Sequence, residues 1–411
     1  MIMAVLNYLD DVLYYPILMV ILIAAGLIFS WKTRCVQLRL FPESIRVVME
    51  KPTEAGKVSS FQALMVSTAS RVGTGNIIGV STAICLGGPG AVFWMWLLAI
   101  IGGATAFIES TLAQIYKRRN PLGHSYGGPA YYIETAMHKR WLGVLFAFSL
   151  IVTYAGGFNL LCSFNMQSTF LVYSFYDPTT TPWIIGAIFA ALVAYCLIGG
   201  GQRIIKVTSV LVPLMGGIYI LAALIVIVFH ITSLPQVFAM IFADAFDFQS
   251  ILGGVSGSCM VYGIKRGLYS NEAGIGSAPN AAAAADVSHP VKQGLVQMLS
   301  VFIDTLLVCS ATAFMGLFSG VPITKEVAGA AYVQNAATAV FGGFGPLLIT
   351  ICMLLFGFST LIGNLFYVDN CIRFIHKGAP SHGFGNTFRI VCVIVVFVGA
   401  GMSMAAVWDI A

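Results

Sequence analysis

Long apolar runs separated by charged connections are the feature that most limits how this chain can fold. Ten runs are long enough to cross the roughly 30 Å hydrocarbon core of a bilayer as helices. They lie at residues 12–31, 60–86, 90–116, 141–172, 183–199, 206–230, 250–268, 293–319, 345–372 and 387–408. Only 9% of the 411 residues are charged, against about 25% in a typical soluble domain. The bilayer is therefore the expected solvent, and we predict an all-α, polytopic membrane protein.

The lysines and arginines predict the orientation of these spans. If the N-terminus lies outside, the inner connections hold 19 of the 21 basic residues, among them Lys265 and Arg266 after the seventh span. The exceptions are Lys325 and Arg71. Basic residues concentrate on the cytoplasmic side, so we expect a multi-pass protein of the cell inner (plasma) membrane. The first run lacks a basic n-region and a cleavage site, so no cleaved signal peptide is expected.

Two spans contain clusters of glycine. The second span carries Gly73-Thr74-Gly75-Asn76, and the seventh carries several glycines between Gly253 and Gly263. Each glycine costs about 1 kcal/mol relative to alanine inside a helix, and clusters this dense favour broken helices over simple close packing. A break exposes N–H groups that attract a carboxylate and carbonyls that attract a cation or an ammonium group. Those are the groups that a zwitterionic amino acid requires.

Several long motifs follow the same order as in a known family of transporters. They are Arg71-Val-Gly-Thr-Gly-Asn-Ile-Ile-Gly-Val80, Gly87-Gly-Pro-Gly-Ala-Val-Phe-Trp-Met-Trp96, Phe107-Ile-Glu-Ser-Thr-Leu-Ala-Gln-Ile-Tyr116, Gly127-Gly-Pro-Ala-Tyr-Tyr132, Ser270-Asn-Glu-Ala-Gly-Ile-Gly-Ser-Ala-Pro279, His289-Pro-Val-Lys-Gln-Gly294 and Phe358-Ser-Thr-Leu-Ile-Gly-Asn364. Over essentially its whole length the chain resembles the alanine or glycine:cation symporter family. The resemblance implies a leucine-transporter-type fold of inverted five-helix repeats. It also implies sodium-coupled symport of a small neutral amino acid, alanine or glycine, by alternating access, with sodium as the co-transported ion and no enzymatic activity.

The resemblance also implies a division of the chain. Residues 1–58 would form a peripheral first helix and a cytoplasmic linker, residues 59–230 the first repeat and residues 248–411 the second, inverted repeat. Ten spans leave the second repeat without its last helix, so we expect an eleventh span to be missing at the C-terminus. Tyr367-Val-Asp369 stands where many members have Tyr-Gly-Glu, and Asn364 replaces a tryptophan found in some members.

Candidate site residues come from the breaks and from the resemblance, and none is catalytic. For the substrate they are Thr74, Gly75, Asn76, Gln167, Ser256, Gly257 and Asn364; for sodium they are Gly73, Ser359 and Thr360. The Gln167 amide could equally line the pocket or bond another helix. Ser270, Asn271 and Glu272 could gate the inner side or cap a helix. Arg71, placed at mid-membrane depth, is expected to pair with Glu109 or Asp304, directly or through one water; the alternative is that it bonds only to carbonyls exposed by the break.

Other functions fit the sequence less well than transport. Gly254-Val-Ser-Gly257 matches the short pattern of intramembrane serine proteases, but every histidine lies in a loop or at a span end, so Ser256 has no base. A passive channel would need continuous rings of charge or carbonyls along a pore, and the sequence does not show them. A carrier for serine or a D-amino acid stays open. The expected partners are a small amino acid, a sodium ion and the lipid bilayer, without nucleic acid, and the expected state is a monomer.

Overall fold

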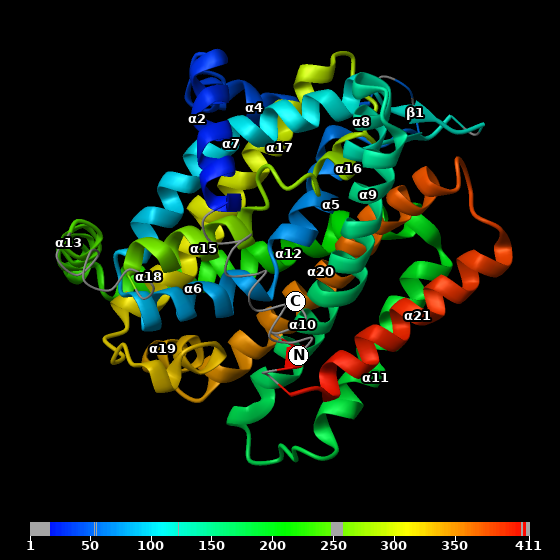
Figure 1. Ribbon diagram of the computed structural model, residues 1–411. Helices are drawn as coiled ribbons and strands as arrows, with labels where there is room; N and C mark the ends of the chain where they lie inside the picture. Colours follow the sequence, from blue (N-terminus) through cyan, green and yellow to red (C-terminus); the bar gives the residue numbers. More distant parts are fainter. Residues whose placement is uncertain are drawn as a thin grey trace.

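The computed structural model describes residues 17–52, 54, 56–121, 123–247, 258–403 and 406–407. Almost all of this part of the chain is helical (Figure 1). The first half contains α2 (Met19–Lys32), α3 (Val36–Arg39), α4 (Phe41–Val48), α5 (Ser60–Arg71), α6 (Thr74–Gly87), α7 (Ala91–Ile115), β1 (Arg118–Arg119), β2 (Ser125–Tyr126), α8 (Pro129–Met137), α9 (Arg140–Ile151), η2 (Val152–Gly157), α10 (Phe158–Ser168), η3 (Thr169–Val172), α11 (Thr181–Ile198) and α12 (Gly200–Phe229).

The described part of the second half is also built of helices. It contains η4 (Ile231–Ser233), α13 (Leu234–Ala245), α15 (Cys259–Asn271), α16 (Pro279–Ala282), α17 (Pro290–Phe302), η5 (Ile303–Cys309), α18 (Ser310–Phe318), η6 (Lys325–Val327), α19 (Ala330–Phe341), α20 (Phe344–Ile375) and α21 (His382–Gly401). The sheet is one short antiparallel hairpin in which Arg118 pairs with Tyr126 and Arg119 with Ser125.

Seven helices of the described residues are long and apolar enough to cross a membrane without interruption. They coincide with seven of the ten predicted spans, so the chain is a multi-pass membrane protein. The predicted first span corresponds to the shorter apolar helix α2, and the second and seventh predicted spans are interrupted. Helices α8 and α13 were not predicted, because each is too short to span the bilayer.

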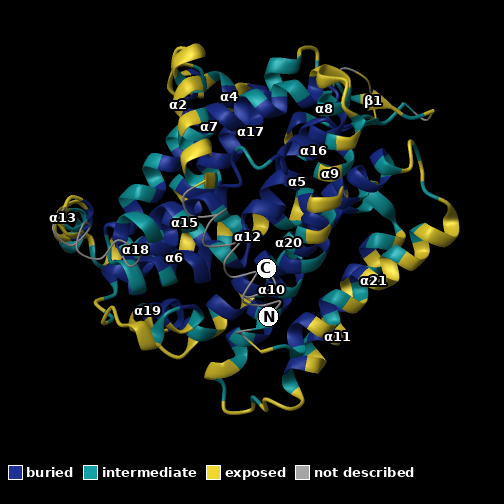
Figure 2. Ribbon diagram, in the orientation of Figure 1, coloured by how far each residue is buried: buried dark blue, intermediate teal, exposed yellow. Residues whose placement is uncertain are grey.

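Buried helices lie near the two interruptions, and more exposed helices lie at the edges of the molecule. Helices α11 and α21 lie side by side at one edge, and α2 packs against α7 on another side (Figure 1). Helices α5, α16 and α17 are almost entirely buried, whereas α11 and α21 expose many side chains (Figure 2). Exposed apolar side chains suit helices that face lipid. The interrupted helices are therefore enclosed by the others, as a transporter site at the middle of a bundle requires.

Candidate substrate and ion site

The first interruption lies between α5 and α6. Helix α5 starts at a capping box, in which the Ser59 hydroxyl accepts from the Gln62 N–H at 3.1 Å and the Gln62 side chain accepts from the Ser59 N–H at 3.0 Å. The helix ends at Arg71, and Val72 and Gly73 leave the helical conformation before α6 begins. A side chain at Gly73 would collide with the Thr360 hydroxyl of α20. The break predicted from the glycine cluster is therefore confirmed.

A second interruption follows α15, further along the chain than the glycines at 253–257. Helix α15 ends at Asn271, and no helix resumes until α16 begins at Pro279. Gly263, part of the cluster expected to break the span, lies inside α15, while Gly253 to Gly257 fall outside the described residues. The interruption after α15 contains Gly274-Ile-Gly276 followed by Pro279, and both of these glycines have positive φ, +91° and +85°.

The bounds of α15 also correct the predicted location of two basic residues. Lys265 and Arg266 belong to α15 and precede the second break. They therefore lie within the seventh span and not in the connection that follows it. The orientation derived from basic residues rests on the remaining connections.

Asp304 joins the two interruptions. It lies in the π-helical segment η5 between α17 and α18, and its side chain is fully buried. The Asn76 amide, at the start of α6, donates to one carboxylate oxygen at 2.6 Å. The Ser270 hydroxyl, at the end of α15, donates to the other at 2.8 Å. A buried carboxylate is stable only when its oxygens are satisfied, so Asp304 fixes the two half-helices against each other.

A small pocket lies between the two interruptions. Five of the predicted site residues line it: Gly73, Thr74, Gly75, Thr360 and Asn364. Sequence reasoning did not assign the other lining residues to the substrate: Ser70, Arg71, Phe158, Cys162, Tyr269, Ser270 and Glu272. Ser70, Arg71 and the pair Tyr269 and Ser270 could have been found by their position one or two residues from a break.

Three predicted substrate or ion residues lie away from this pocket. Asn76 is fully buried, and its side chain is occupied by Asp304 and by the Gly73 N–H, which it accepts at 2.8 Å. The Gln167 amide accepts from the Tyr176 hydroxyl at 2.8 Å. The Ser359 hydroxyl donates to the Phe356 carbonyl at 2.9 Å and faces the Met215 sulfur of α12. Ser256 and Gly257, also predicted, lie outside the described residues.

Oxygen atoms converge where α20 passes the first break. The Thr360 hydroxyl lies 3.2 Å from the Ala69 carbonyl and 3.5 Å from the Ser70 carbonyl, at the unsatisfied C-terminal end of α5. Helix α20 comes this close because Gly363 faces the Ser70 backbone, where a Cβ would lie 2.7 Å from the Ser70 nitrogen. Hydroxyl and carbonyl oxygens are the ligands that a sodium ion takes beside a broken helix.

Arg71 does not form the predicted direct ion pair with Glu109 or Asp304. Its guanidinium donates to the Gln297 carbonyl of α17 at 3.2 Å, and among the described residues no carboxylate lies within ion-pair distance of it. The oxygens of Asp304 are occupied by other donors, and a Glu109 oxygen accepts from the Gly274 N–H at 3.3 Å. The direct pair is therefore absent, and Arg71 is held by a carbonyl, as in the alternative expectation.

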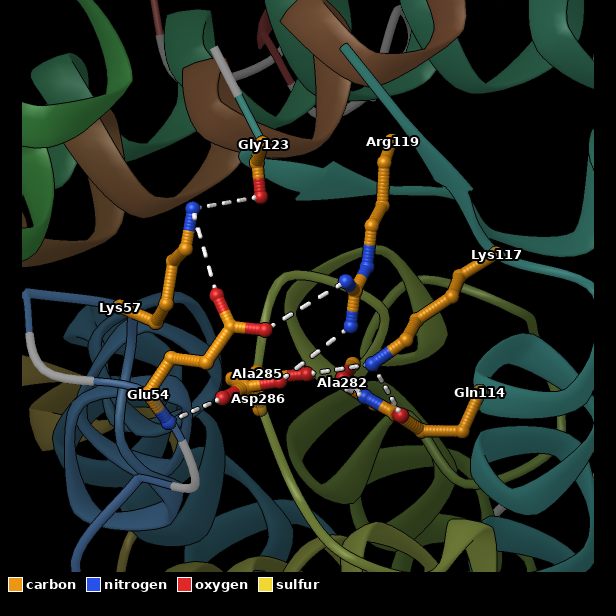
Figure 3. Close-up of polar contacts among 9 residues, drawn as sticks. All are labelled: Glu54, Lys57, Gln114, Lys117, Arg119, Gly123, Ala282, Ala285 and Asp286. Atoms are coloured by element: carbon orange, nitrogen blue, oxygen red, sulfur yellow. Dashed lines mark hydrogen bonds and ion pairs between the residues drawn. The ribbon is translucent and has the colours of Figure 1, made fainter. Parts of the chain in front are cut away.

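A charged cluster joins the segments next to both interruptions (Figure 3). It consists of Glu54, Lys57, Gln114, Lys117, Arg119, Gly123, Ala282, Ala285 and Asp286. Asp286, which follows α16, accepts from the Glu54 N–H at 2.9 Å and lies 3.6 Å from the Arg119 guanidinium. Lys117, just after α7, donates to the Ala285 carbonyl at 2.8 Å; burial lowers its pKa, and the nearby Asp286 partly offsets this. The charged cluster thus ties the residues before α5 to those after α16.

Two helices interrupted around a buried polar pocket define the class of a secondary transporter. The comparisons agree with this class. All of residues 1–411 match the Sodium:alanine symporter family. The chain belongs to this family, whose members are transporters and not enzymes.

Named relatives illustrate the range of the family. The chain is 44% identical to the amino-acid carrier protein AlsT of Bacillus subtilis, over 95% of this chain and 82% of that protein. It is 41% identical to the "Probable sodium/glutamine symporter GlnT" of the same organism, over 98% and 83%. It is 35% identical to the sodium/alanine symporter AgcS of Methanococcus maripaludis, over 99% and 90%.

A solved structure supports the fold. The chain resembles a Na⁺-coupled sialic acid symporter in a substrate-bound, outward-open state, with a TM-score of 0.54 and 13% identity over 95% of this chain and 80% of that one. The predicted fold class, a leucine-transporter-type polytopic helical protein, is confirmed. The division into repeats at 59–230 and 248–411 stays a prediction.

Proposed function

We propose that this protein couples the entry of a sodium ion to the uptake of a small neutral amino acid, alanine or glycine, by alternating access. The observation that carries the proposal is the placement of Thr360. Its hydroxyl faces the Ala69 and Ser70 carbonyls at the end of α5 and also lines the pocket at the first break. An ion held there would hold α5 against α20 in the conformation that shapes the pocket.

The other end of the same break suits the carboxylate of the substrate. Helix α6 begins at Thr74, so its first N–H groups lack acceptors within the helix and carry the positive end of the helix dipole. Thr74 and Gly75 line the pocket. The absence of a side chain at Gly75 lets a carboxylate approach the backbone. Asn364 completes this polar wall, because its amide oxygen accepts from the Ser70 hydroxyl at 2.6 Å.

Alternating access requires the two sides of the pocket to open in turn. The charged cluster around Asp286 closes the side on which α5 begins and α16 ends. We assign this side to the cytoplasm, because the basic connections lie there, and place the N-terminus outside, in the plasma membrane. Release of substrate inward then requires this cluster to separate.

Uptake into proteoliposomes tests the proposal. We expect labelled alanine to accumulate when sodium is outside and not when potassium replaces it. Unlabelled glycine should compete strongly, and unlabelled glutamine weakly, because the pocket is small. Equal uptake in sodium and potassium contradicts sodium coupling, and preferential competition by glutamine contradicts the substrate class.

A further inference from the structure

We propose that Glu272 provides the negative charge that binds the α-ammonium group of the transported amino acid. The inference rests on the proposed function and names the pocket residue that distinguishes an amino acid from other small carboxylates. It begins with the position of Glu272 in the second break. Glu272 is the residue at which α15 stops, with φ 50° and ψ 23°. This left-handed conformation is uncommon for a residue with a Cβ and is often found at functional sites.

The side chain of Glu272 lies in the substrate pocket. Among the residues that line the pocket it is the one carboxylate, and it is only 3% exposed. The Ser277 hydroxyl, from the same interruption, donates to one of its oxygens at 2.6 Å and orients it. Within the described part of the chain, no lysine or arginine is within ion-pair distance of Glu272; Arg71 acts on it only from farther away.

The charge balance around the pocket favours a cation. Three buried carboxylates, those of Glu109, Glu272 and Asp304, share the influence of a single buried arginine, Arg71. Asp304 accepts three side-chain hydrogen bonds outside the pocket, whereas Glu272, with Ser277, Tyr154 and Ser70 as polar neighbours, lines the pocket. A buried carboxylate without a nearby cation is strongly unfavourable. The negative end of the α15 dipole adds to this potential, because Glu272 follows its last turn.

The pocket therefore has two ends of opposite sign. Thr74 and Gly75 present the N-terminus of α6, and Glu272 presents a carboxylate at the C-terminus of α15. An α-amino acid carries its carboxylate and ammonium groups on adjacent atoms, so it can span such a pocket. A 2-hydroxy acid such as lactate has the same size but lacks the positive charge. A sodium ion has the positive charge but lacks a carboxylate. Binding measured at several sodium concentrations distinguishes a sodium ion at Glu272 from the ammonium group.

Glu272→Gln tests the proposal, because glutamine keeps the shape and the acceptor for Ser277 while removing the charge. Binding of alanine and of lactate to the purified protein would be measured at several sodium concentrations. Loss of a charged hydrogen bond predicts about tenfold to hundredfold weaker alanine binding. Lactate binding and the sodium concentration for half-maximal binding should stay unchanged, so the preference for alanine over lactate collapses.

Controls separate this result from misfolding. Glu134→Gln removes a carboxylate of α8 that bonds Arg118 and Arg140 away from the pocket, and alanine binding should not change. Glu272→Asp keeps the charge and should retain the preference for alanine over lactate. If Glu272→Gln does not fold, Ser277→Ala should weaken alanine binding severalfold and leave lactate unaffected.

Other outcomes overturn the proposal. Unchanged alanine affinity in Glu272→Gln rules out Glu272 as the ammonium ligand. A raised sodium requirement with an intact preference for alanine assigns the charge to sodium instead. If the wild-type protein binds no small neutral amino acid in sodium, the proposed function itself fails, and this outcome is distinct from both.

Discussion

Thr360 and Ser359 are adjacent in sequence but face different neighbours. Thr360 points to the carbonyls at the end of α5, whereas Ser359 points to Met215 of α12. Adjacent positions on a helix lie on different faces, so a sequence motif that contains both hydroxyls does not say which one meets the break.

We expect Thr360→Val to raise the sodium concentration needed for half-maximal uptake by roughly threefold to tenfold. Valine keeps the shape but removes one oxygen, and the loss of one such interaction is worth about 0.5–1.5 kcal/mol. The sodium dependence of alanine uptake into proteoliposomes measures this. Ser359→Ala is the matched control and should shift the sodium dependence little; equal shifts in both variants would contradict the assignment to Thr360.

Asn76→Ala should destabilise the fold as well as impair transport. The Asn76 amide holds Asp304 and the Gly73 N–H, and alanine leaves these buried groups without their partner. We expect a loss of about 1–3 kcal/mol in the free energy of unfolding, seen as a lower melting temperature in detergent. Gln167→Ala, which removes an amide bonded to Tyr176, provides the comparison. A melting temperature unchanged in Asn76→Ala would argue for a direct role in substrate binding.

At the scale of elements, the uninterrupted spans could be predicted from the sequence, and the interruption between α15 and α16 could not. Apolar runs alone located the seven long helices, because their length is set by the thickness of the bilayer. The first break followed from the glycines around Thr74. In the seventh span, Gly263 was expected to help break the helix, but it lies inside α15. Positive φ values occur at Gly274 and Gly276 instead, after the end of α15.

Glycine patterns identified the site residues of the first break, and the family resemblance added Thr360 and Asn364 of α20. Gly73, Thr74 and Gly75 line the pocket because they are the break. The roles of Asn76 and Gln167 depend on partners such as Asp304 and Tyr176, and the direction of a side chain cannot be read from its chain position. Glu272 was expected to gate the inner side or cap a helix and not to line the pocket, because its carboxylate reaches the pocket through the left-handed turn that ends α15.

The charged cluster gives a prediction about opening. Asp286→Asn should weaken the tie between Arg119 and the segment after α16, and so favour conformations open on that side. Cys162, which lines the pocket, reports access to it, and Cys35→Ser removes the one exposed cysteine. In that background we expect faster labelling of Cys162 by a thiol reagent in inside-out vesicles. Glu43→Gln, in an exposed pair with Arg46, is the control; equal rates in all variants would contradict a gating role.

At the scale of the whole molecule, the orientation can be tested directly. Cys35 follows α2 and is the one exposed thiol among the nine cysteines. With the N-terminus outside, a membrane-impermeant maleimide should label Cys35 in inside-out vesicles and not in intact cells. Lys325→Cys, in the exposed segment η6 and in a Cys35→Ser background, should show the opposite pattern. Labelling of both positions from one side would overturn the predicted topology.

The hydrogen bonds of Asp304 have a consequence for how the chain assembles during synthesis. Asn76 meets Asp304 across 228 positions of sequence, and Ser270 meets it across 34. When α6 first enters the bilayer, the Asn76 oxygen can accept from the nearby Gly73 N–H, but its NH₂ group lacks the Asp304 acceptor, and an unpaired polar group in hydrocarbon is costly. The Asn76 amide can bond Asp304 only after the eighth span, which contains Asp304, is inserted. The first break therefore reaches its final form late, and the protein becomes able to hold a substrate only after most of its chain has been made.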